Sequence, residues 1–253
     1  MTDQASLLPL EFTTDAGFGV RARIGLIVLE TDHTLEAEIR SLDVPGVAWY
    51  HSRIPMEPEV TPTTLTDMEA RLPVAAGLLP SEFDFAAIGF GCTSAATLIG
   101  DDGVTGAVRV AHPEMPVTNP ISAAINAFEA LGSRRIAVVT PYTADVTAPI
   151  VAHFEAAGVE VSAVGSFLES RDHVVAKITE ESVAAGVRQV VEQSECDGVF
   201  ISCTSLRSFD IVETLESELG VPVVSSNLAF SWRLLRLAGV DDALAGRGRL
   251  FRT

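Results

Sequence analysis

Short apolar runs rich in β-branched residues alternate along the chain with longer segments in which apolar residues recur every three or four positions. The first pattern is typical of buried strands and the second of amphipathic helices. Their alternation predicts an α/β fold in which crossover helices join parallel strands. The predicted strands are residues 23–29, 46–51, 85–90, 135–140, 159–165 and 198–202, with short pieces at 116–118 and 222–225. The predicted helices are residues 34–42, 64–79, 94–100, 120–131, 144–157, 179–194, 206–219 and 229–238.

The order of elements occurs twice. A Cys-Thr-Ser tripeptide follows a predicted strand at Cys92 and again at Cys203. Each tripeptide precedes a helix, a Pro-Val strand and a capped helix, in MPVTNPISAAINAFEALG (115–132) and in VPVVSSNLAFSWRLLRLAG (221–239). Such a repeat implies two similar α/β lobes related by an approximate two-fold axis, with equivalent loops facing across a cleft.

This repeat divides the chain into parts. We expect a first lobe over residues 23–132, a second over 133–228, and a C-terminal helix and tail over 229–253 that cross back to the first lobe. Residues 1–22 fit neither pattern and are predicted to form an N-terminal arm, either disordered or covering the cleft or a partner subunit. The proline-rich segment 54–62 (IPMEPEVTP) is predicted to be a lid or an oligomer contact. We expect a homo-oligomer, either a dimer or a tetramer.

Composition narrows the classes of function. A chain of 253 residues with 47% hydrophobic residues can bury a sizeable core. The formal net charge of −17 argues against a nucleic-acid partner, because binding to phosphates depends on clustered Lys and Arg. There is no apolar run of about 18 residues and no basic-then-apolar leader, so we expect a soluble, cytoplasmic protein with no membrane contact.

No pattern indicates a metal or a nucleotide. The three cysteines lack C-x-x-C spacing, and the five histidines show no i, i+4 pairing with one another or with cysteines. The glycines at 89 and 91 are not followed by a P-loop or a dinucleotide-binding motif. We therefore predict free thiols, no metal and no bound nucleotide.

The two repeated cysteines are candidates for chemistry. Each ends an apolar run and precedes a helix, which predicts a place at the carboxyl edge of a parallel sheet, where α/β folds bind ligands. A helix N-terminus beside a thiol can lower its pKa from about 8.5 and can bind a carboxylate. Two such turns suit a small carboxylate whose reacting carbon lies between the sulfurs, either for inversion of a stereocentre or for addition to a double bond. The neighbouring hydroxyls predicted to hold the carboxylate are Thr93, Ser94, Thr204 and Ser205.

The alternative is inert packing, because free cysteines are among the most buried residues. That role suits Cys196, which has no such context. It suits Cys92 and Cys203 less well, because both share one tripeptide and one strand-to-helix setting.

Three segments carry a family resemblance: GFGCTSAATLIG (89–100), TPY (140–142) and ISCTSLRSFDIVETLESELGVPVVSSN (201–227). They resemble the aspartate/glutamate racemase superfamily, and within it the branch of maleate cis-trans isomerase, arylmalonate decarboxylase and the ectoine-utilisation A protein. The resemblance extends over residues 23–238. It implies two flavodoxin-like lobes with the active site in the interlobe cleft, cofactor-independent chemistry, and Cys92 and Cys203 as the catalytic pair. In maleate isomerases, a tyrosine at the position of Tyr142 helps to hold a substrate carboxylate.

Two positions depart from the maleate isomerases, which carry asparagines where this chain has Asp32 and Asp172. An amide can donate to a carboxylate, whereas an ionised Asp only accepts hydrogen bonds and repels an anion. The two acids therefore predict a substrate with an ammonium or amide N–H, as the ectoine-utilisation branch suggests. The alternative is that Asp32 and Asp172 only cap helices and that Tyr142 is only a turn residue.

These observations predict a cofactor-independent racemase or isomerase of a small, amino-acid-like carboxylate, with a two-cysteine mechanism. The alternative is a maleate cis-trans isomerase. Less favoured are an arylmalonate-type decarboxylase, since decarboxylases of the branch have glycine at the position of Cys92, and a binding protein without turnover.

Overall fold

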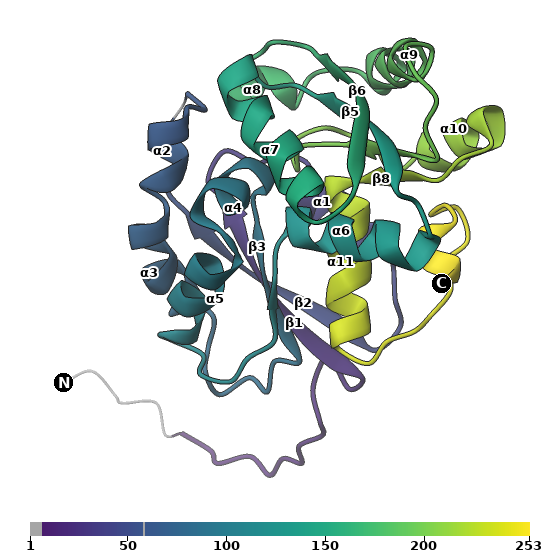
Figure 1. Ribbon diagram of the computed structural model, residues 1–253. Coiled ribbons are helices and arrows are strands. Elements are labelled where there is room, and N and C mark those ends of the chain that lie inside the picture. The colour runs from purple at the N-terminus through teal and green to yellow at the C-terminus, as the bar shows by residue number, and fades with distance from the viewer. Residues whose placement is uncertain (1–6, 58) are drawn as a thin grey trace.

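The computed structural model describes residues 7–57 and 59–253, which form two lobes, each built on a four-stranded parallel sheet (Figure 1). The first sheet has the order β2 (Val47–Ile54), β1 (Ala22–Leu29), β3 (Ala87–Gly91) and β4 (Val117–Thr118); the second has the order β6 (Glu160–Ser166), β5 (Arg135–Thr140), β7 (Gly198–Ile201) and β8 (Val223–Ser225). The strand order is the same in both lobes and is that of flavodoxin-like folds. The predicted α/β fold with two pseudo-symmetric lobes is confirmed.

The helices connect these strands in chain order. Those of the first half are α1 (Leu35–Arg40), α2 (Pro62–Thr66), α3 (Leu72–Ala76), α4 (Thr93–Ile99), α5 (Asp101–Arg109) and α6 (Pro120–Leu131). Those of the second half are α7 (Ala144–Ala156), α8 (Asp172–Val175), α9 (Glu180–Val191), α10 (Val212–Leu219) and α11 (Ser226–Leu237). Short 3-10 helices span Glu69–Arg71 and Leu250–Arg252. None of these described helices has the length and apolar character that crossing a bilayer requires.

The central strands are buried along almost their whole length. β1 is buried at every position but one, and β3 and β7 are buried throughout. Continuous apolar strands of this kind are typical of parallel sheets with both faces covered by helices. The chain leaves each of these strands directly into a polar turn, so the polar side chains gather at the carboxyl edges of the two sheets.

The last helix of each half packs against the other lobe. In α11, the ring of Phe230 lies on β3 of the first lobe, so close to Gly89 that a Cβ there would be 2.3 Å from Phe230 Cζ. In α6, the ring of Phe128 lies 6.3 Å from that of Phe200 on β7 of the second lobe. The two helices also contact each other (Figure 1). The lobes are therefore joined by exchanged helices as well as by the chain between them.

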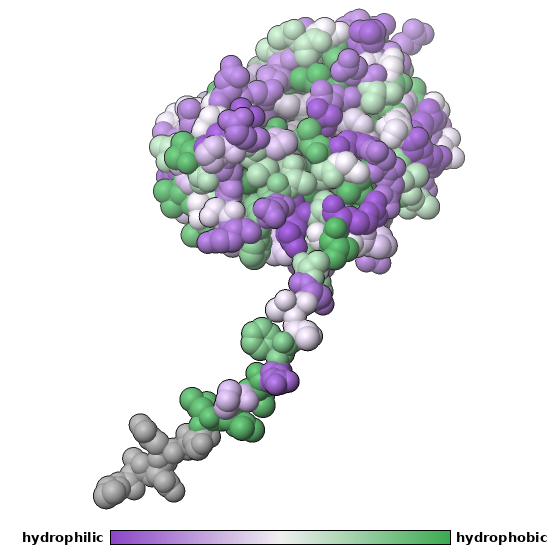
Figure 2. Space-filling model, turned by 90° about the horizontal axis from the view of Figure 1, so that it is seen from below, coloured by the Kyte–Doolittle hydropathy of each residue, from purple (hydrophilic) through white to green (hydrophobic). Residues whose placement is uncertain are grey.

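The two ends of the chain behave differently. The C-terminal tail contacts both lobes: Asp242 pairs with Arg21, Arg247 donates to the carbonyl of Ser41 at 3.1 Å, and Arg252 pairs with Glu213 at 2.7 Å. The N-terminal arm extends away from the body from residue 7 to about residue 20, with apolar side chains along it (Figure 2). The first six residues of the predicted arm lie outside the described part of the chain.

Several predicted elements were wrong in detail. The helix predicted over residues 64–79 is divided into α2, a 3-10 turn and α3, because Pro73 lacks the N–H that a continuous helix requires and instead lies in the first turn of α3. Gly100, at φ 81°, ends α4, and α5 follows it directly and was not predicted. The helix predicted from residue 206 begins only at Val212, and the four-residue α8 was also missed.

Candidate active site

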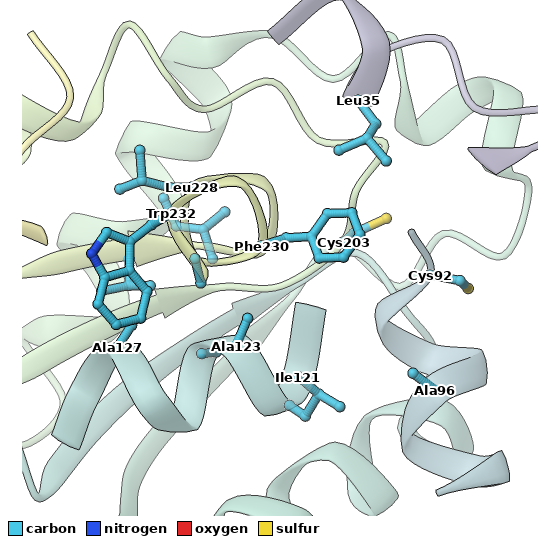
Figure 3. Close-up of a cluster of buried hydrophobic side chains, with 14 of the residues drawn as sticks. Leu35, Cys92, Ala96, Ile121, Ala123, Ala127, Cys203, Leu228, Phe230 and Trp232 are labelled. Atoms are coloured by element: carbon cyan, nitrogen blue, oxygen red, sulfur yellow. The ribbon is translucent and has the colours of Figure 1, made fainter. Parts of the chain in front are cut away.

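The two Cys-Thr-Ser turns come together from the ends of β3 and β7. Ser226, at the start of α11, joins them: its Oγ accepts from the Thr93 hydroxyl at 2.8 Å and from the Cys203 N–H at 3.0 Å. The Thr204 hydroxyl also donates to the carbonyl of Gly91 at 3.4 Å. Both cysteines lie at the edge of the buried apolar cluster around α11 (Figure 3). The structure therefore brings the two repeated thiols into one interlobe site.

Cys92 is the N-cap of α4. Its Sγ accepts a hydrogen bond from the Ala95 N–H at 3.4 Å and lies 3.8 Å from the Ser94 hydroxyl. The side chain is buried, and this burial raises the pKa of the Cys92 thiol to about 12, although the Ala95 N–H opposes the shift. The expected lowering of the pKa by the helix N-terminus is wrong here, since loss of hydration outweighs it.

Cys203 has a different local structure. It adopts a φ of 114°, a region that non-glycine residues rarely occupy and that costs about 1–3 kcal/mol. Its Sγ accepts from the Ser205 N–H at 3.4 Å. Burial, followed by the charge of Asp172, raises the pKa of the Cys203 thiol well above its usual value. No helix begins next to Cys203, so the expected helix-terminus effect is absent at this thiol.

The two carboxylate oxygens of Asp32 have different surroundings. Oδ1 accepts from the N–H groups of Thr34 and Leu35 at 2.7 and 2.8 Å, at the start of α1. Oδ2 is buried and has no hydrogen-bond partner among the described residues. Burial raises the pKa of Asp32 to about 6; the N–H groups of Leu35 and Thr34 and the nearby Thr204 hydroxyl oppose this shift, and the charge of Asp172 adds to it. Asp32 therefore binds the start of a helix with one oxygen, while its other oxygen accepts no hydrogen bond although the Thr204 hydroxyl lies near the carboxylate.

Asp172 links the two lobes. Its Oδ1 accepts from the Ser205 hydroxyl at 2.8 Å, and its Oδ2 accepts from the Thr31 hydroxyl at 2.7 Å. Both partners are hydroxyls from other loops, so the carboxylate does not cap α8. Asp172 binds Ser205, which is two residues from Cys203 in the sequence. Asp172 is therefore part of the wall around that thiol.

Tyr142 follows β5 and touches both turns. Its side chain is buried, and its hydroxyl interacts with Cys203 and with Ser94. Burial raises the pKa of Tyr142 well above its usual value, so the phenol stays protonated and remains a hydrogen-bond donor. Its position next to both thiols suits a group that orients a substrate.

The proline-rich segment contacts the chain just before Asp172. Val60, in the proline-rich segment, donates to the carbonyl of Ser170 at 3.2 Å, and Glu59 forms a β-bridge with Arg171. The Thr31 hydroxyl, which donates to Asp172, also contacts the sulfur of Met56 at 2.9 Å. All the predicted site side chains are at most 5% exposed, so the site is shielded from solvent.

The sequence reasoning did not assign two residues that hold the site together, Ser226 and Glu38. In the sequence, Ser226 lies between a predicted strand and a predicted helix, which indicates a loop bordering the cleft but not the bonds to both turns that it makes as the first residue of α11. Glu38 lies three residues after Leu35 and one before Ile39, on the buried face of α1. This place in the apolar pattern could have indicated that its carboxylate is buried. Among the described residues, no group of three or more His, Cys, Asp or Glu side chains could hold a metal ion.

These features define an α/β enzyme with two lobes and a pair of thiols in the site between them. The chain belongs to the arylmalonate decarboxylase family, whose model matches residues 107–251. It is 30% identical over 250 residues to the maleate isomerase of Nocardia farcinica, covering 92% of this chain and 96% of that protein. It is 34% identical over 139 residues to the arylmalonate decarboxylase of Bordetella bronchiseptica, covering 54% and 58%.

Solved structures agree with this membership. A variant of the Nocardia farcinica maleate cis-trans isomerase with a covalently bound succinylcysteine intermediate superposes with a TM-score of 0.83 at 27% identity, covering 91% of this chain and 98% of that one. The predicted superfamily branch and the predicted isomerase class of enzyme are therefore confirmed.

Proposed function

We propose that the chain is a two-cysteine isomerase that inverts a stereocentre in a small carboxylate bearing an ammonium or amide N–H. The observation that carries this proposal is the buried, unpartnered Oδ2 of Asp32, in the same site as Asp172, Cys92 and Cys203. The resemblance to the ectoine-utilisation branch suggests a diaminobutyrate-type compound from ectoine breakdown as the substrate.

The charge of the site favours such a substrate over a dianion. Asp32, with a pKa of about 6, is mostly ionised at neutral pH. No cationic side chain is among the groups that shift the pKa of Asp32, of Cys92 or of Cys203. A dianion would add further negative charge in a place of low dielectric, where repulsion is strong. A zwitterion carries its own ammonium group, which can donate a hydrogen bond to Oδ2 of Asp32.

Substrate binding would also prepare the thiols for reaction. The charges of Asp32 and Asp172 both raise the pKa values of the Cys92 and Cys203 thiols. An ammonium group placed beside these acids opposes that effect and lowers the pKa of each thiol. One thiolate then removes the proton from the α-carbon, and the other thiol delivers a proton to the opposite face.

The hydroxyls divide into two groups. Thr93 donates to Ser226 and Ser205 donates to Asp172, so these two hydroxyls hold the turns in place. We assign the substrate carboxylate to Ser94, Thr204 and Tyr142. The hydroxyls of Ser94 and Tyr142 lie beside the thiols, and that of Thr204, which also lies near Asp32, makes only a long bond of 3.4 Å to the Gly91 carbonyl.

A second candidate is maleate cis-trans isomerisation. The observation that favours it is the 30% identity to the Nocardia farcinica maleate isomerase over 92% of this chain. In that reaction, Cys92 would add to the double bond, rotation would follow about the new single bond, and Cys203 would act as the acid.

Proton NMR in D2O separates the two candidates. The protein would be incubated with L- and D-amino acids, N-acetylated diaminobutyrate and maleate. Appearance of the opposite enantiomer with deuterium at its α-carbon, lost in Cys92→Ala and in Cys203→Ala, would support the racemase. Conversion of maleate to fumarate, without turnover of any amine-bearing compound, would refute the racemase and support the second candidate.

A further inference from the structure

A buried carboxylate of the first lobe, Glu38, is bonded entirely to the second half of the chain. Its Oε1 accepts from the N–H groups of Ser208 and Phe209 at 2.6 and 3.0 Å, and its Oε2 accepts from the Asn227 side-chain amide at 2.7 Å. Helix α1, which carries Glu38, also directs Leu35 toward Phe230 and Cys203 (Figure 3). Glu38 therefore bridges the lobes directly behind the active site.

The partners of Glu38 belong to the turn that begins at Cys203. Ser208 and Phe209 lie at the far end of this turn, between β7 and α10. Asn227 uses the same amide group to donate to the Thr204 carbonyl at 2.8 Å, one residue from Cys203. Glu38 thus holds both ends of the turn, one through backbone N–H groups and the other through Asn227.

This turn needs support from outside. Cys203 is strained at a φ of 114°, and no helix follows it until Val212. Strained residues of this kind persist only when surrounding contacts fix them. Burying a carboxylate is a poor way to gain stability alone, since removing the charge from water costs more than hydrogen bonds usually return. Fixing the geometry of the turn gives this carboxylate a specific role.

We propose that Glu38 is a positioning residue for Cys203, holding the turn from Cys203 to Phe209 so that its thiol faces the site shared with Cys92. The inference rests on the proposed two-thiol function only for its effect on turnover; its effect on the thiol itself is independent of any substrate.

The test compares the two thiols within one molecule. Iodoacetamide labelling of the full-length protein, followed by mass spectrometry, gives separate rates for Cys203 and Cys92. Glu38→Ala should raise the Cys203-to-Cys92 rate ratio about tenfold or more, because the freed turn exposes only the second thiol. Glu38→Gln should raise the ratio less than Glu38→Ala, because its amide oxygen still accepts from the two backbone N–H groups while its NH2 group can no longer accept from Asn227.

Glu216→Ala is the matched control. Glu216 is also a buried carboxylate that accepts from two backbone N–H groups, those of Val223 and Arg249, but it lies away from the thiols. It should leave the rate ratio and the turnover unchanged. If Glu38→Ala does not fold, Asn227→Ala breaks the second link and should raise the ratio in the same way.

An unchanged ratio in Glu38→Ala, or in Asn227→Ala where that variant is used, would overturn the assignment, as would an equal rise at both thiols. Turnover, on whichever substrate the NMR panel identifies, should fall in kcat with little change in KM. A change in the labelling ratio without any detectable substrate would support the positioning role while refuting the proposed function, so the two failures can be told apart.

Discussion

The turn at Cys92 and the turn at Cys203 share their tripeptide and their place at the end of a central strand, but they are fixed in different ways. Cys92 starts α4 with an ordinary extended φ of −145° and is held by a neighbouring N–H. Cys203 is strained and is held by Ser226 and, through its turn, by Glu38 of the other lobe. The geometry of the first thiol is therefore local, whereas that of the second depends on how the lobes meet.

The largest effect that tests this comparison is removal of either thiol. Cys92→Ala and Cys203→Ala should each lower the rate of inversion about 1,000-fold, because one face of the substrate loses its acid or base. Each variant should keep exchange of the α-proton with D2O for one enantiomer only, and the two variants should keep opposite enantiomers. Chiral chromatography with mass spectrometry would measure both. Full inversion by a single-cysteine variant would rule out the two-thiol mechanism.

The next effect concerns pH, because the group that fixes the second turn can titrate. Burial raises the pKa of Glu38 to about 7, and the charge of Asp32 adds to the shift. His33, Arg207 and Asp210 line a cavity of about 270 Å³ beside it. Since the folded protein binds this proton more tightly, the stability that Glu38 contributes is fully present below about pH 4.5 and is lost as the pH rises to about 7, by on the order of 3 kcal/mol.

Urea unfolding of the parent and of Glu38→Gln between pH 5 and pH 8 would measure this contribution. The variant should lose that part of the pH dependence and should be the more stable protein at pH 8. Parallel curves for the two proteins would show that Glu38 does not titrate in this range.

The two acids of the site should respond unequally to amide substitution. Asp32→Asn should lower kcat/KM for an ammonium-bearing substrate about 10- to 100-fold, the value of one charge-assisted hydrogen bond. Its effect should fall mainly on KM, because the free Oδ2 is bonded to no other residue of the site. Asp172→Asn should also lower kcat, since Asp172 accepts from Ser205 in the Cys203 turn. Equal effects on KM alone, or improved use of the amine, would contradict the amine-reading role.

The same contrast explains what could be predicted from the sequence. The ends of β3 and β7 follow from apolar runs that stop at a cysteine, and parallel strands bring such ends to one edge. The grouping of Asp32, Tyr142 and Asp172 with the thiols was predicted through the family resemblance. In each case the signal is local, a strand end or a motif.

What could not be predicted depends on contacts between distant residues. The Cys203 turn replaces the first part of a predicted helix because Glu38, far away in the sequence, accepts its N–H groups. The raised pKa values of the two thiols follow from burial between the lobes, which no local pattern indicates. The packing of α6 and α11 against the opposite lobes likewise depends on distant contacts, those of Phe128 with Phe200 and of Phe230 with Gly89.

The smallest effect that tests the comparison is on stability, at the contact that places α11 and so Ser226. In Gly89→Ala, the new Cβ would meet Phe230 Cζ at 2.3 Å and Cε2 at 2.5 Å, so the ring and its helix must shift. We expect a loss of about 1–3 kcal/mol in the free energy of unfolding. Gly106→Ala, in the interior of α5 with nothing within 4 Å of a new Cβ, is the control and should stabilise by about 0.5–1 kcal/mol.

Thermal and urea unfolding would measure both glycine variants, and thiol labelling of Gly89→Ala would connect the result to the comparison of the two turns. A shifted α11 moves Ser226, which holds the backbone of Cys203 but only the neighbour of Cys92. Labelling of Cys203 should therefore rise more than labelling of Cys92. An equal rise at both thiols would mean that the first turn depends on the lobe interface as much as the second, and the contrast between a local and a long-range turn would no longer hold.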